Sequence, residues 1–190
     1  MKKAIKRSIV VLAIAAISLS VGFIYGAILD SLDRATHPRD YSEWVEKYSA
    51  EYGVAEHIVY SVIKVESGFD SAVVSRAGAI GLMQLTPETF EWVQFLLGEK
   101  LERGMLYDPE TNIKYGTYLL SYLFSEFGNW ESALAAYNAG MARVKGWLDD
   151  PQYTDERGRL INIPIKETRE YVAKVDRAEQ VYLRLYYGVE

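Results

Sequence analysis

An uncharged run of 21 residues, Ile9 to Leu29, constrains this chain more than any other stretch. A helix of that length can span the hydrocarbon core of a bilayer, whereas the apolar core of a cleaved signal peptide is shorter, about 7–15 residues. Four basic residues precede the run, and positive charge favours the cytoplasmic side of a membrane. The sequence therefore predicts a single-pass anchor in the cell membrane over residues 1–29, with the remainder extracytoplasmic. Cleavage near Ser20 is the alternative.

The part of the chain after Leu29 is acidic. It holds all 26 Asp and Glu residues against 17 of the 21 Lys and Arg residues, a net charge of −9. This charge argues against nucleic acid as a partner. The chain has no cysteine, which excludes disulfides and thiolate metal sites. Its two histidines, His37 and His57, are not at ligand spacing, so we expect no metal and no cofactor.

Apolar residues recur at helical spacing through most of the outer part, and glycines mark several helix ends. No alternating strand pattern of useful length is present. The sequence therefore predicts an all-α domain over residues 41–190, joined to the anchor by a polar tether over residues 30–40. Helices are expected near 41–53, 55–67, 87–97, 109–127, 130–139 and 144–148, then a loop over 149–164 and a last helix over 165–187.

Glu66 extends the apolar face of the helix expected over 55–67, lying four and three residues beyond Val62 and Ile63. A buried acid is costly unless it has a purpose. Gly68 favours a helix end there, which places Glu66 near the negative end of the helix dipole. Burial and the dipole both raise the pKa of a carboxyl group, and an acid kept protonated near neutral pH can act as a general acid on a glycosidic bond. A solvent-facing glutamate is the alternative.

The residues after Glu66 form an ordered set of motifs, ESGFD followed by SRAGAIGLMQLTP over residues 75–87. Together they resemble the lysozyme-like catalytic domain of the SLT-type lytic transglycosylases, which cleave the glycan strands of peptidoglycan. The resemblance implies a lysozyme-like fold, all-α or α+β at most through a small hairpin near 70–82. It also implies that Glu66 is the sole catalytic acid/base.

Three later segments extend the resemblance to roughly residues 41–187. They are NIKYGTYLLSYL from Asn112, AYNAG from Ala136, and IP with ETREYV from Ile163. The family match implies that the residues binding substrate are Ser75, Gln84, Tyr137, Asn138, Glu167 and Tyr171. Each of these has a plainer interpretation as well, such as loop polarity, helix capping or core packing.

Three residues near the motifs have structural interpretations. Asp70 could be a second catalytic carboxylate, as in two-acid glycosidases, but Gly68 interrupts the helix before it and the family uses no second acid. We expect it to cap a loop. Met83 is expected in the core. Thr86 stands where the family often has Met, and the Pro87 that follows favours a helix N-cap.

The apolar N-terminal run and the resemblance together imply a membrane-anchored enzyme that cleaves the bond between MurNAc and GlcNAc in peptidoglycan glycan strands and forms 1,6-anhydroMurNAc. A second acid is not required if the sugar's own C6 hydroxyl is the nucleophile. Two alternatives remain open: a lysozyme-type hydrolase, and a non-catalytic glycan-binding scaffold of an envelope complex. The sequence identifies no protein partner.

Overall fold

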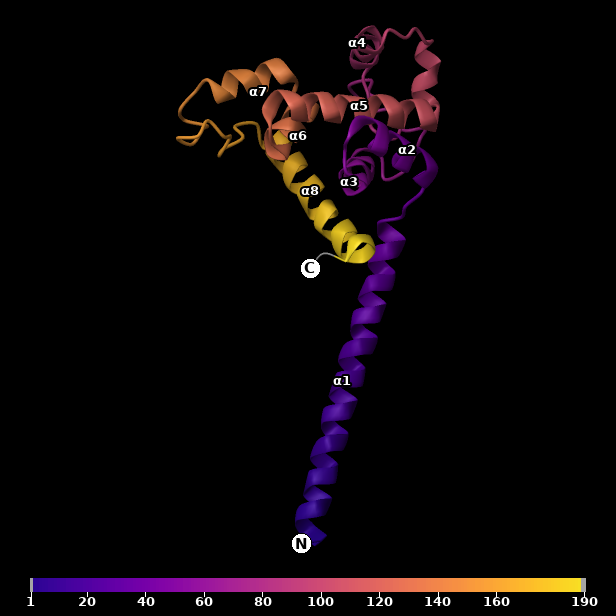
Figure 1. Ribbon diagram of the computed structural model, residues 1–190, viewed down its shortest axis with the longest axis vertical. Coiled ribbons are helices and arrows are strands. Elements are labelled where there is room, and N and C mark those ends of the chain that lie inside the picture. The colour runs from indigo at the N-terminus through magenta and orange to yellow at the C-terminus, as the bar shows by residue number, and fades with distance from the viewer. Residues whose placement is uncertain (1, 189–190) are drawn as a thin grey trace. The chain divides into compact units, whose positions relative to one another are not determined.

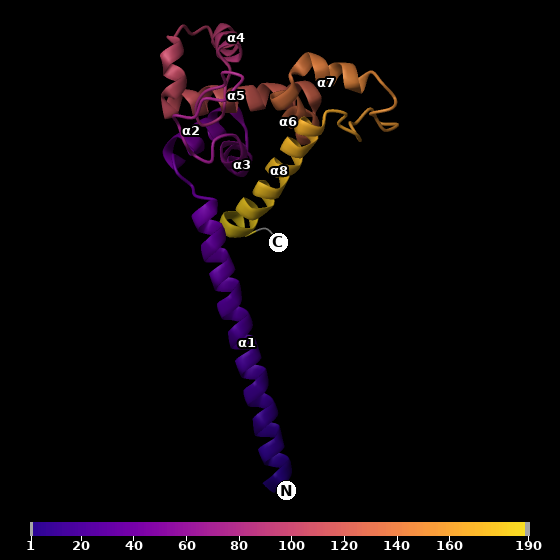
Figure 2. The ribbon, with the colours of Figure 1, turned by 180° about the vertical axis from the view of Figure 1, so that it is seen from behind.

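The computed structural model describes residues 2–188, and their side chains at residue 12 and from residue 14 onward. The chain divides into two units, one ending at Pro38 and one beginning at Arg39. Figures 1 and 2 show the first as a single long helix and the second as a set of packed helices.

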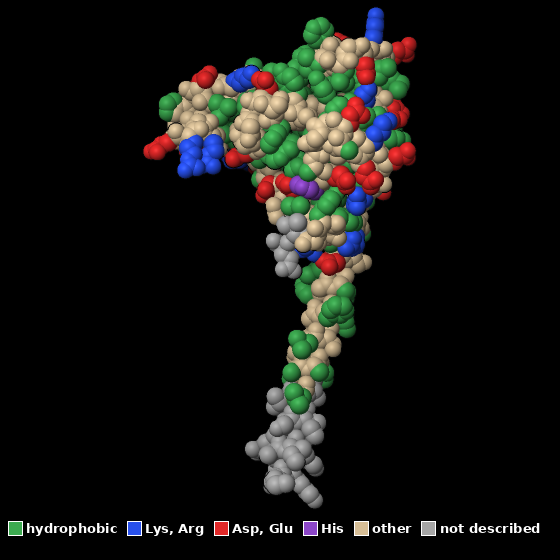
Figure 3. Space-filling model, in the orientation of Figure 1, with side chains coloured by type: hydrophobic (Ala, Val, Ile, Leu, Met, Phe, Trp, Pro, Cys, Tyr) green, Lys and Arg blue, Asp and Glu red, His purple; other side chains and the backbone are tan. Residues whose placement is uncertain are grey.

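The first unit is α1, Lys2–Thr36. Its described apolar side chains are exposed, with Phe23 80% and Leu19 76% accessible, and Figure 3 shows hydrophobic side chains along it. Residues 14–36 are long and apolar enough to cross a membrane. The helix continues seven residues beyond Leu29, so most of the segment expected to be a tether is helical.

The second unit contains seven α-helices and two shorter helical segments among the described residues. The prediction of an all-α domain is confirmed, and most of the expected helix bounds agree within two residues. The elements are α2 Ser42–Tyr52, α3 Glu56–Glu66, α4 Pro87–Leu97, the 3-10 helix η1 Arg103–Tyr107, α5 Pro109–Phe127, α6 Trp130–Ala139, α7 Met141–Leu148, α8 Lys166–Tyr182 and the π-helical η2 Leu183–Tyr187.

Side-chain caps explain why three of these helices begin where they do. Thr86, Asp108 and Asn129 each accept a hydrogen bond from the backbone N–H three residues later, which satisfies a group that the helix itself leaves unpaired. Gly98 and Gly128 end α4 and α5 in the left-handed conformation. The expected N-cap role of Thr86 is confirmed.

Helix α5 lies at the centre of the domain and packs against α2, α4, α6 and η1, while α8 packs along α3 and α6. Burial of apolar side chains from all these helices supplies the main stabilisation of the fold. The fully buried side chains include Tyr60, Leu82, Met83, Phe90, Ile113, Tyr115, Leu120 and Tyr182. Met83 is therefore a core residue, as expected.

Two segments differ from the expectations. The possible hairpin near 70–82 is reduced to isolated bridges that pair Ile80 with Val74 and with Leu85, and the described residues form no strand. Ile80 takes part in both bridges, so the loop folds on itself too tightly for a ladder. The last helix changes to a π-helical turn after Tyr182.

Candidate active site

Glu66 is the last residue of α3, because the chain turns sharply after it. Gly68 and Phe69 both have positive φ, 59° and 73°. Left-handed backbone is strained for a side chain as large as Phe, and burial of the Phe69 ring near Tyr60 offsets that cost. The turn leaves the Glu66 carboxyl half-buried at the end of the helix, as the sequence predicted.

The surroundings of Glu66 favour its neutral form. Burial raises the pKa of this carboxyl from 4.5 to about 7, and an interaction with the Tyr171 hydroxyl partly opposes the shift. No cation pairs with Glu66 among the described residues, and no carboxylate is among the groups that shift its pKa. Near pH 7 a substantial fraction of Glu66 is therefore protonated and able to donate a proton.

Two tyrosines from different helices accompany Glu66. The Tyr137 hydroxyl, on α6, donates to the Met83 carbonyl oxygen at 2.7 Å. The Tyr171 hydroxyl, on α8, interacts with Glu66 but completes no hydrogen bond of standard geometry. Burial and then the charge of Glu66 raise the pKa of both phenols well above the ordinary value. Both hydroxyls therefore stay neutral. The Tyr137 hydroxyl gives its one proton to Met83 and can accept a hydrogen bond, while the Tyr171 hydroxyl can donate to the Glu66 carboxylate.

Gln84 and Ser75 shape the loop between α3 and α4. Gln84 has a positive φ of 49°, and its Nε2 donates to the carbonyl oxygens of Val73 and Gly81. The Ser75 hydroxyl accepts a hydrogen bond from the Ala79 N–H. Both side chains therefore bond to the backbone of their own loop, and Gln84 Oε1 is left without a partner among the described residues.

Asn112, which the sequence analysis did not single out, ties this loop to α5. Its Nδ2 donates to the carbonyl oxygens of Ile80 and Leu106, and its Oδ1 accepts from the Met83 N–H at 2.8 Å. A side chain at Gly81 would collide with Asn112, so the close approach requires glycine. The signal for Asn112 was a polar residue on the apolar face of a predicted helix.

The remaining predicted site residues lie at the surface. Asn138 follows Tyr137, and Glu167 lies one turn before Tyr171 on α8. Both are exposed, and their side chains make no hydrogen bond with the described residues. Asp70 accepts a hydrogen bond from the Ala72 N–H, which confirms its expected role in the loop. The structure thus brings together Glu66, Tyr137 and Tyr171.

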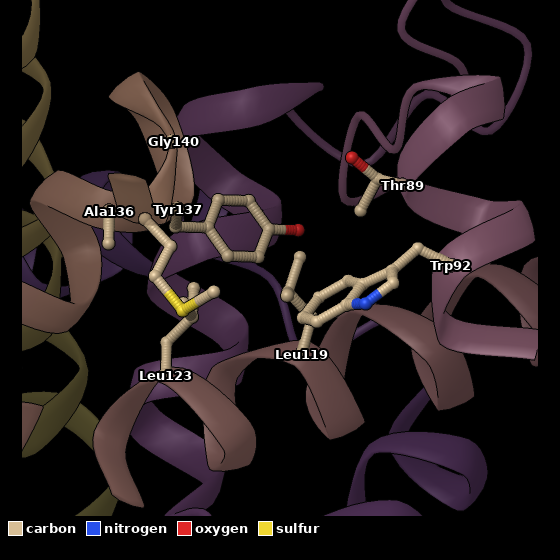
Figure 4. A pocket seen from close by; sticks show the side chains of 8 residues that line it. Thr89, Trp92, Leu119, Leu123, Ala136, Tyr137 and Gly140 are labelled. Carbon is tan, nitrogen blue, oxygen red and sulfur yellow. The ribbon is translucent and has the colours of Figure 1, made fainter. Parts of the chain in front are cut away.

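A cavity of about 230 Å³ opens beside Tyr137. Figure 4 shows Tyr137 and Trp92 extending toward each other from opposite walls, with Leu119 between them. Helices α4, α5, α6 and α7 all contribute side chains to it. The described residues contain no group of three or more His, Asp or Glu side chains that could hold a metal ion.

The family described as the transglycosylase SLT domain matches residues 43–159. Among curated proteins, the soluble lytic murein transglycosylase of Escherichia coli K12 is 34% identical over 169 residues, which cover 87% of this chain and 26% of that protein. The membrane-bound lytic murein transglycosylase C of Haemophilus ducreyi is 29% identical over 171 residues, covering 77% of this chain and 46% of that protein. The chain thus spans about a quarter of the Escherichia coli relative's length.

Solved structures give the same result. The lytic transglycosylase Slt of Pseudomonas aeruginosa, solved as an inactive Glu-to-Gln mutant, superposes with a TM-score of 0.73 at 31% identity, covering 81% of this chain and 25% of that one. A 70-kDa soluble lytic transglycosylase in complex with bulgecin A gives a TM-score of 0.75 at 32% identity, covering 83% and 26%. The expected lysozyme-like, all-α fold is confirmed by these neighbours.

Proposed function

This chain belongs to the transglycosylase SLT domain family, and we propose that it is a membrane-anchored lytic transglycosylase of peptidoglycan. It cleaves the β-1,4 bond between MurNAc and GlcNAc and leaves a 1,6-anhydroMurNAc end. The proposal is carried by one observation: a half-buried carboxyl, Glu66, whose pKa burial raises to about 7, with the hydroxyls of Tyr137 and Tyr171 close enough to interact with it.

Glu66 acts first as the acid. Its proton goes to the bridging oxygen as the bond from that oxygen to C1 of MurNAc breaks, and GlcNAc leaves with a free hydroxyl. Glu66 becomes a carboxylate, which the neutral Tyr171 hydroxyl stabilises by donating to it. The Pseudomonas relative, inactive with Gln in place of a Glu, supports an essential glutamate in this family.

Glu66 then acts as the base. The carboxylate takes the proton of the C6 hydroxyl of the same MurNAc, the C6 oxygen forms a bond to C1, and Glu66 regains its neutral form. Holding the C6 hydroxyl next to C1 replaces the activated water that a hydrolase needs. The lack of a carboxylate among the groups that act on Glu66 supports this internal nucleophile.

The other predicted residues bind the glycan. Tyr137 contacts the sugar next to the acid, and the buried Tyr171 acts on the substrate through Glu66. The exposed side chains of Asn138 and Glu167 offer polar groups that no described residue occupies. Gln84 offers its free Oε1. Ser75 contributes through the shape of its loop.

The proposed function includes a membrane anchor and an outer catalytic domain. Helix α1 crosses the cell membrane once, with the basic N-terminus inside and residues 41–190 outside, where peptidoglycan lies. Its exposed apolar surface and the membrane-bound Haemophilus relative support this topology. Cell fractionation with protease added to protoplasts tests it: a full-length membrane protein that is cut from outside is expected, whereas a shortened soluble form would show a cleaved signal.

Analysis of the products separates the proposal from its alternatives. Purified sacculi treated with the protein should release muropeptides lighter by one water than reducing-end products, seen by mass spectrometry without borohydride reduction. Asp70→Asn should change the rate little, because Asp70 is engaged with its own loop. Reducing-end MurNAc with strong dependence on Asp70 would favour a lysozyme-type hydrolase, and binding without cleavage would favour a scaffold.

A further inference from the structure

The backbone of Met83 is held at both of its polar groups by side chains from two helices. Its N–H donates to Asn112 Oδ1 on α5 at 2.8 Å, and its carbonyl oxygen accepts from the Tyr137 hydroxyl on α6 at 2.7 Å. Asn112 is 1% exposed, and its amide nitrogen donates to two further backbone carbonyl oxygens. The Asn112 side chain is therefore fixed, and it fixes the backbone of Met83 in turn.

Gly116 lies one turn after Asn112 on α5 and gives α5 a second contact with Met83. A side chain at position 116 would collide with the Met83 side chain, its Cβ included, so this close approach requires glycine. Helix α5 thus holds Met83 at its N–H and at its side chain. The Met83 carbonyl oxygen is left in one position, where the Tyr137 hydroxyl donates to it.

The Tyr137 hydroxyl has one proton, and the Met83 carbonyl oxygen accepts it. The charge of Glu66 raises the pKa of Tyr137, so the two groups are close enough to interact, but no hydrogen bond from Tyr137 acts on the pKa of Glu66. A phenol whose proton is engaged elsewhere can only accept from a carboxyl group, which favours the protonated carboxyl. Tyr171 acts in the opposite sense, because its interaction with Glu66 lowers the pKa of that group.

We propose that Asn112 is a positioning residue for the reaction: through Met83 it keeps the Tyr137 proton on the Met83 carbonyl oxygen, and so prevents Tyr137 from donating to the Glu66 carboxylate. Tyr137 from α6 and Tyr171 from α8 are the titratable groups that interact with Glu66 among the described residues. If both donated, Glu66 would ionise at lower pH and less of it could act as the acid. The inference rests on the proposed function, because it takes Glu66 as that acid.

The test follows the titration of the Glu66 carboxyl by carbon-13 NMR in the full-length protein and does not require turnover. Asn112→Ala releases the Met83 backbone, so the Tyr137 proton can turn to the Glu66 carboxylate. One hydrogen bond to a charged group is worth roughly one pH unit, so Glu66 should titrate roughly one pH unit lower than in the wild type. A folded variant in which Glu66 titrates as in the wild type would overturn the inference.

Asn129→Ala is the matched control. Asn129 caps α6, the helix that carries Tyr137, and its two hydrogen bonds are to the backbone of Phe127 and Ser132. Its loss should lower Tm and leave the titration of Glu66 unchanged. A shift as large as that of Asn112→Ala would mean that any loosening of the domain has this effect, and would overturn the inference.

Gly116→Ala decides the matter if Asn112→Ala does not fold. It removes no hydrogen-bonding group, and the collision with the Met83 Cβ means that the backbone of Met83 must move. Glu66 should again titrate lower than in the wild type. An unchanged titration in this variant would contradict the proposed role of the Met83 carbonyl.

Tyr137→Phe shows whether the effect passes through Tyr137. Without that hydroxyl there is no proton to redirect, so adding Asn112→Ala should leave the titration of Glu66 where Tyr137→Phe alone places it. A difference between the single and the double variant would show that Asn112 acts on Glu66 by another route, and the inference would fail.

Cleavage assays separate this inference from the proposed function. If the wild type does not cleave sacculi, the proposed reaction fails, whereas the titrations still test the role of Asn112. If it does cleave, Asn112→Ala should lower kcat/KM about tenfold at pH 8 and little at pH 5.5, because the protonated acid is lost at lower pH. An equal loss at both pH values would show a purely structural role and would overturn the inference.

Discussion

The two ends of α3 carry the same side chain in opposite surroundings. At its first residue, Glu56 accepts hydrogen bonds from Arg39 at 2.9 Å and from the Tyr187 hydroxyl at 2.8 Å. The helix dipole also favours negative charge there. At its last residue, Glu66 interacts with the Tyr171 hydroxyl and pairs with no cation in the part of the chain that the structure describes. The fold thus supplies a counter-charge where the carboxylate is structural and none where the carboxyl must hold a proton.

Glu→Gln substitution at each end gives the sharpest contrast. Glu66→Gln should reduce cleavage of sacculi by at least about 10²–10⁴-fold, because the amide cannot donate the proton and no neighbouring carboxyl can replace it. Glu56→Gln should leave kcat within a factor of about two, since it lies at the far end of the helix. Turnover is measured by release of muropeptides, with protein folding checked by tryptophan fluorescence. Near-normal turnover of Glu66→Gln would refute the assignment.

The pH dependence of cleavage should report the protonated form of Glu66. With a pKa near 7, the acid is present below that pH and is lost above it. If Glu66 is the group that limits the rate, kcat/KM should be constant below pH 7 and should fall about tenfold per pH unit above it. Initial rates between pH 5.5 and 8.5 measure this. A rate that already falls about tenfold per pH unit between pH 5.5 and 7 would mean that Glu66 has its ordinary pKa near 4.5, and a rate that does not fall above pH 7 would mean that the protonated form is not needed.

Stability should change in opposite directions at the two ends. Between the ordinary pKa of 4.5 and about 7 the folded chain holds a proton that the unfolded chain has lost, so stability falls as pH rises through that range. The loss in the free energy of unfolding is at most about 3 kcal/mol. Glu66→Gln should remove this loss, so the variant should have a higher Tm than the wild type at pH 8 and the same Tm at pH 4. Equal melting at both pH values would contradict the raised pKa.

Glu56→Gln should instead lower stability. The ion pair with Arg39 is about one-third exposed, so its loss should cost only about 1 kcal/mol, a drop of roughly 3 °C in Tm. Thermal denaturation of the two variants beside wild type, in the same detergent, checks both signs together. A higher Tm for Glu56→Gln would show that the pair does not stabilise the domain.

The smallest effect is expected from Tyr171. Its hydroxyl interacts with the Glu66 carboxylate and lowers the pKa of Glu66 against the larger effect of burial. Tyr171→Phe should therefore raise that pKa and move the basic limb of the rate profile to higher pH, by less than one unit. A purely structural role would change the rate without moving the limb. Tyr60→Phe is the control, because the Tyr60 ring is buried on α3 and its hydroxyl interacts with Arg39 and not with Glu66.

Much of this account could be predicted from periodicity and caps. The Thr86–Pro87 and Asp108–Pro109 pairs fixed the starts of α4 and α5, because each combines an N-cap side chain with a residue already set for helix. The position of Glu66 followed from the apolar face of α3 and from Gly68. These signals are local, so a single stretch of sequence contains them.

What the sequence could not predict depends on contacts between distant segments. The hydrogen bonds of Asn112 to the loop near Ile80, and of Tyr137 to Met83, join residues 32 and 54 positions apart. No local sequence pattern indicates which carbonyl oxygen will accept a hydrogen bond from a buried amide or phenol. The position of Trp92 in a cavity could not be predicted for the same reason, because four helices contribute to that cavity.

A direct titration of the Glu66 carboxyl tests the central claim of this account. Protein labelled with carbon-13 at glutamate side-chain carboxyls would be followed by NMR from pH 4 to 9, and Glu66→Gln would identify the signal that belongs to Glu66. The account predicts a carboxyl that titrates near pH 7 and that disappears in the variant. A Glu66 signal that titrates near 4.5 would show an ordinary, ionised glutamate and would contradict its role as the acid.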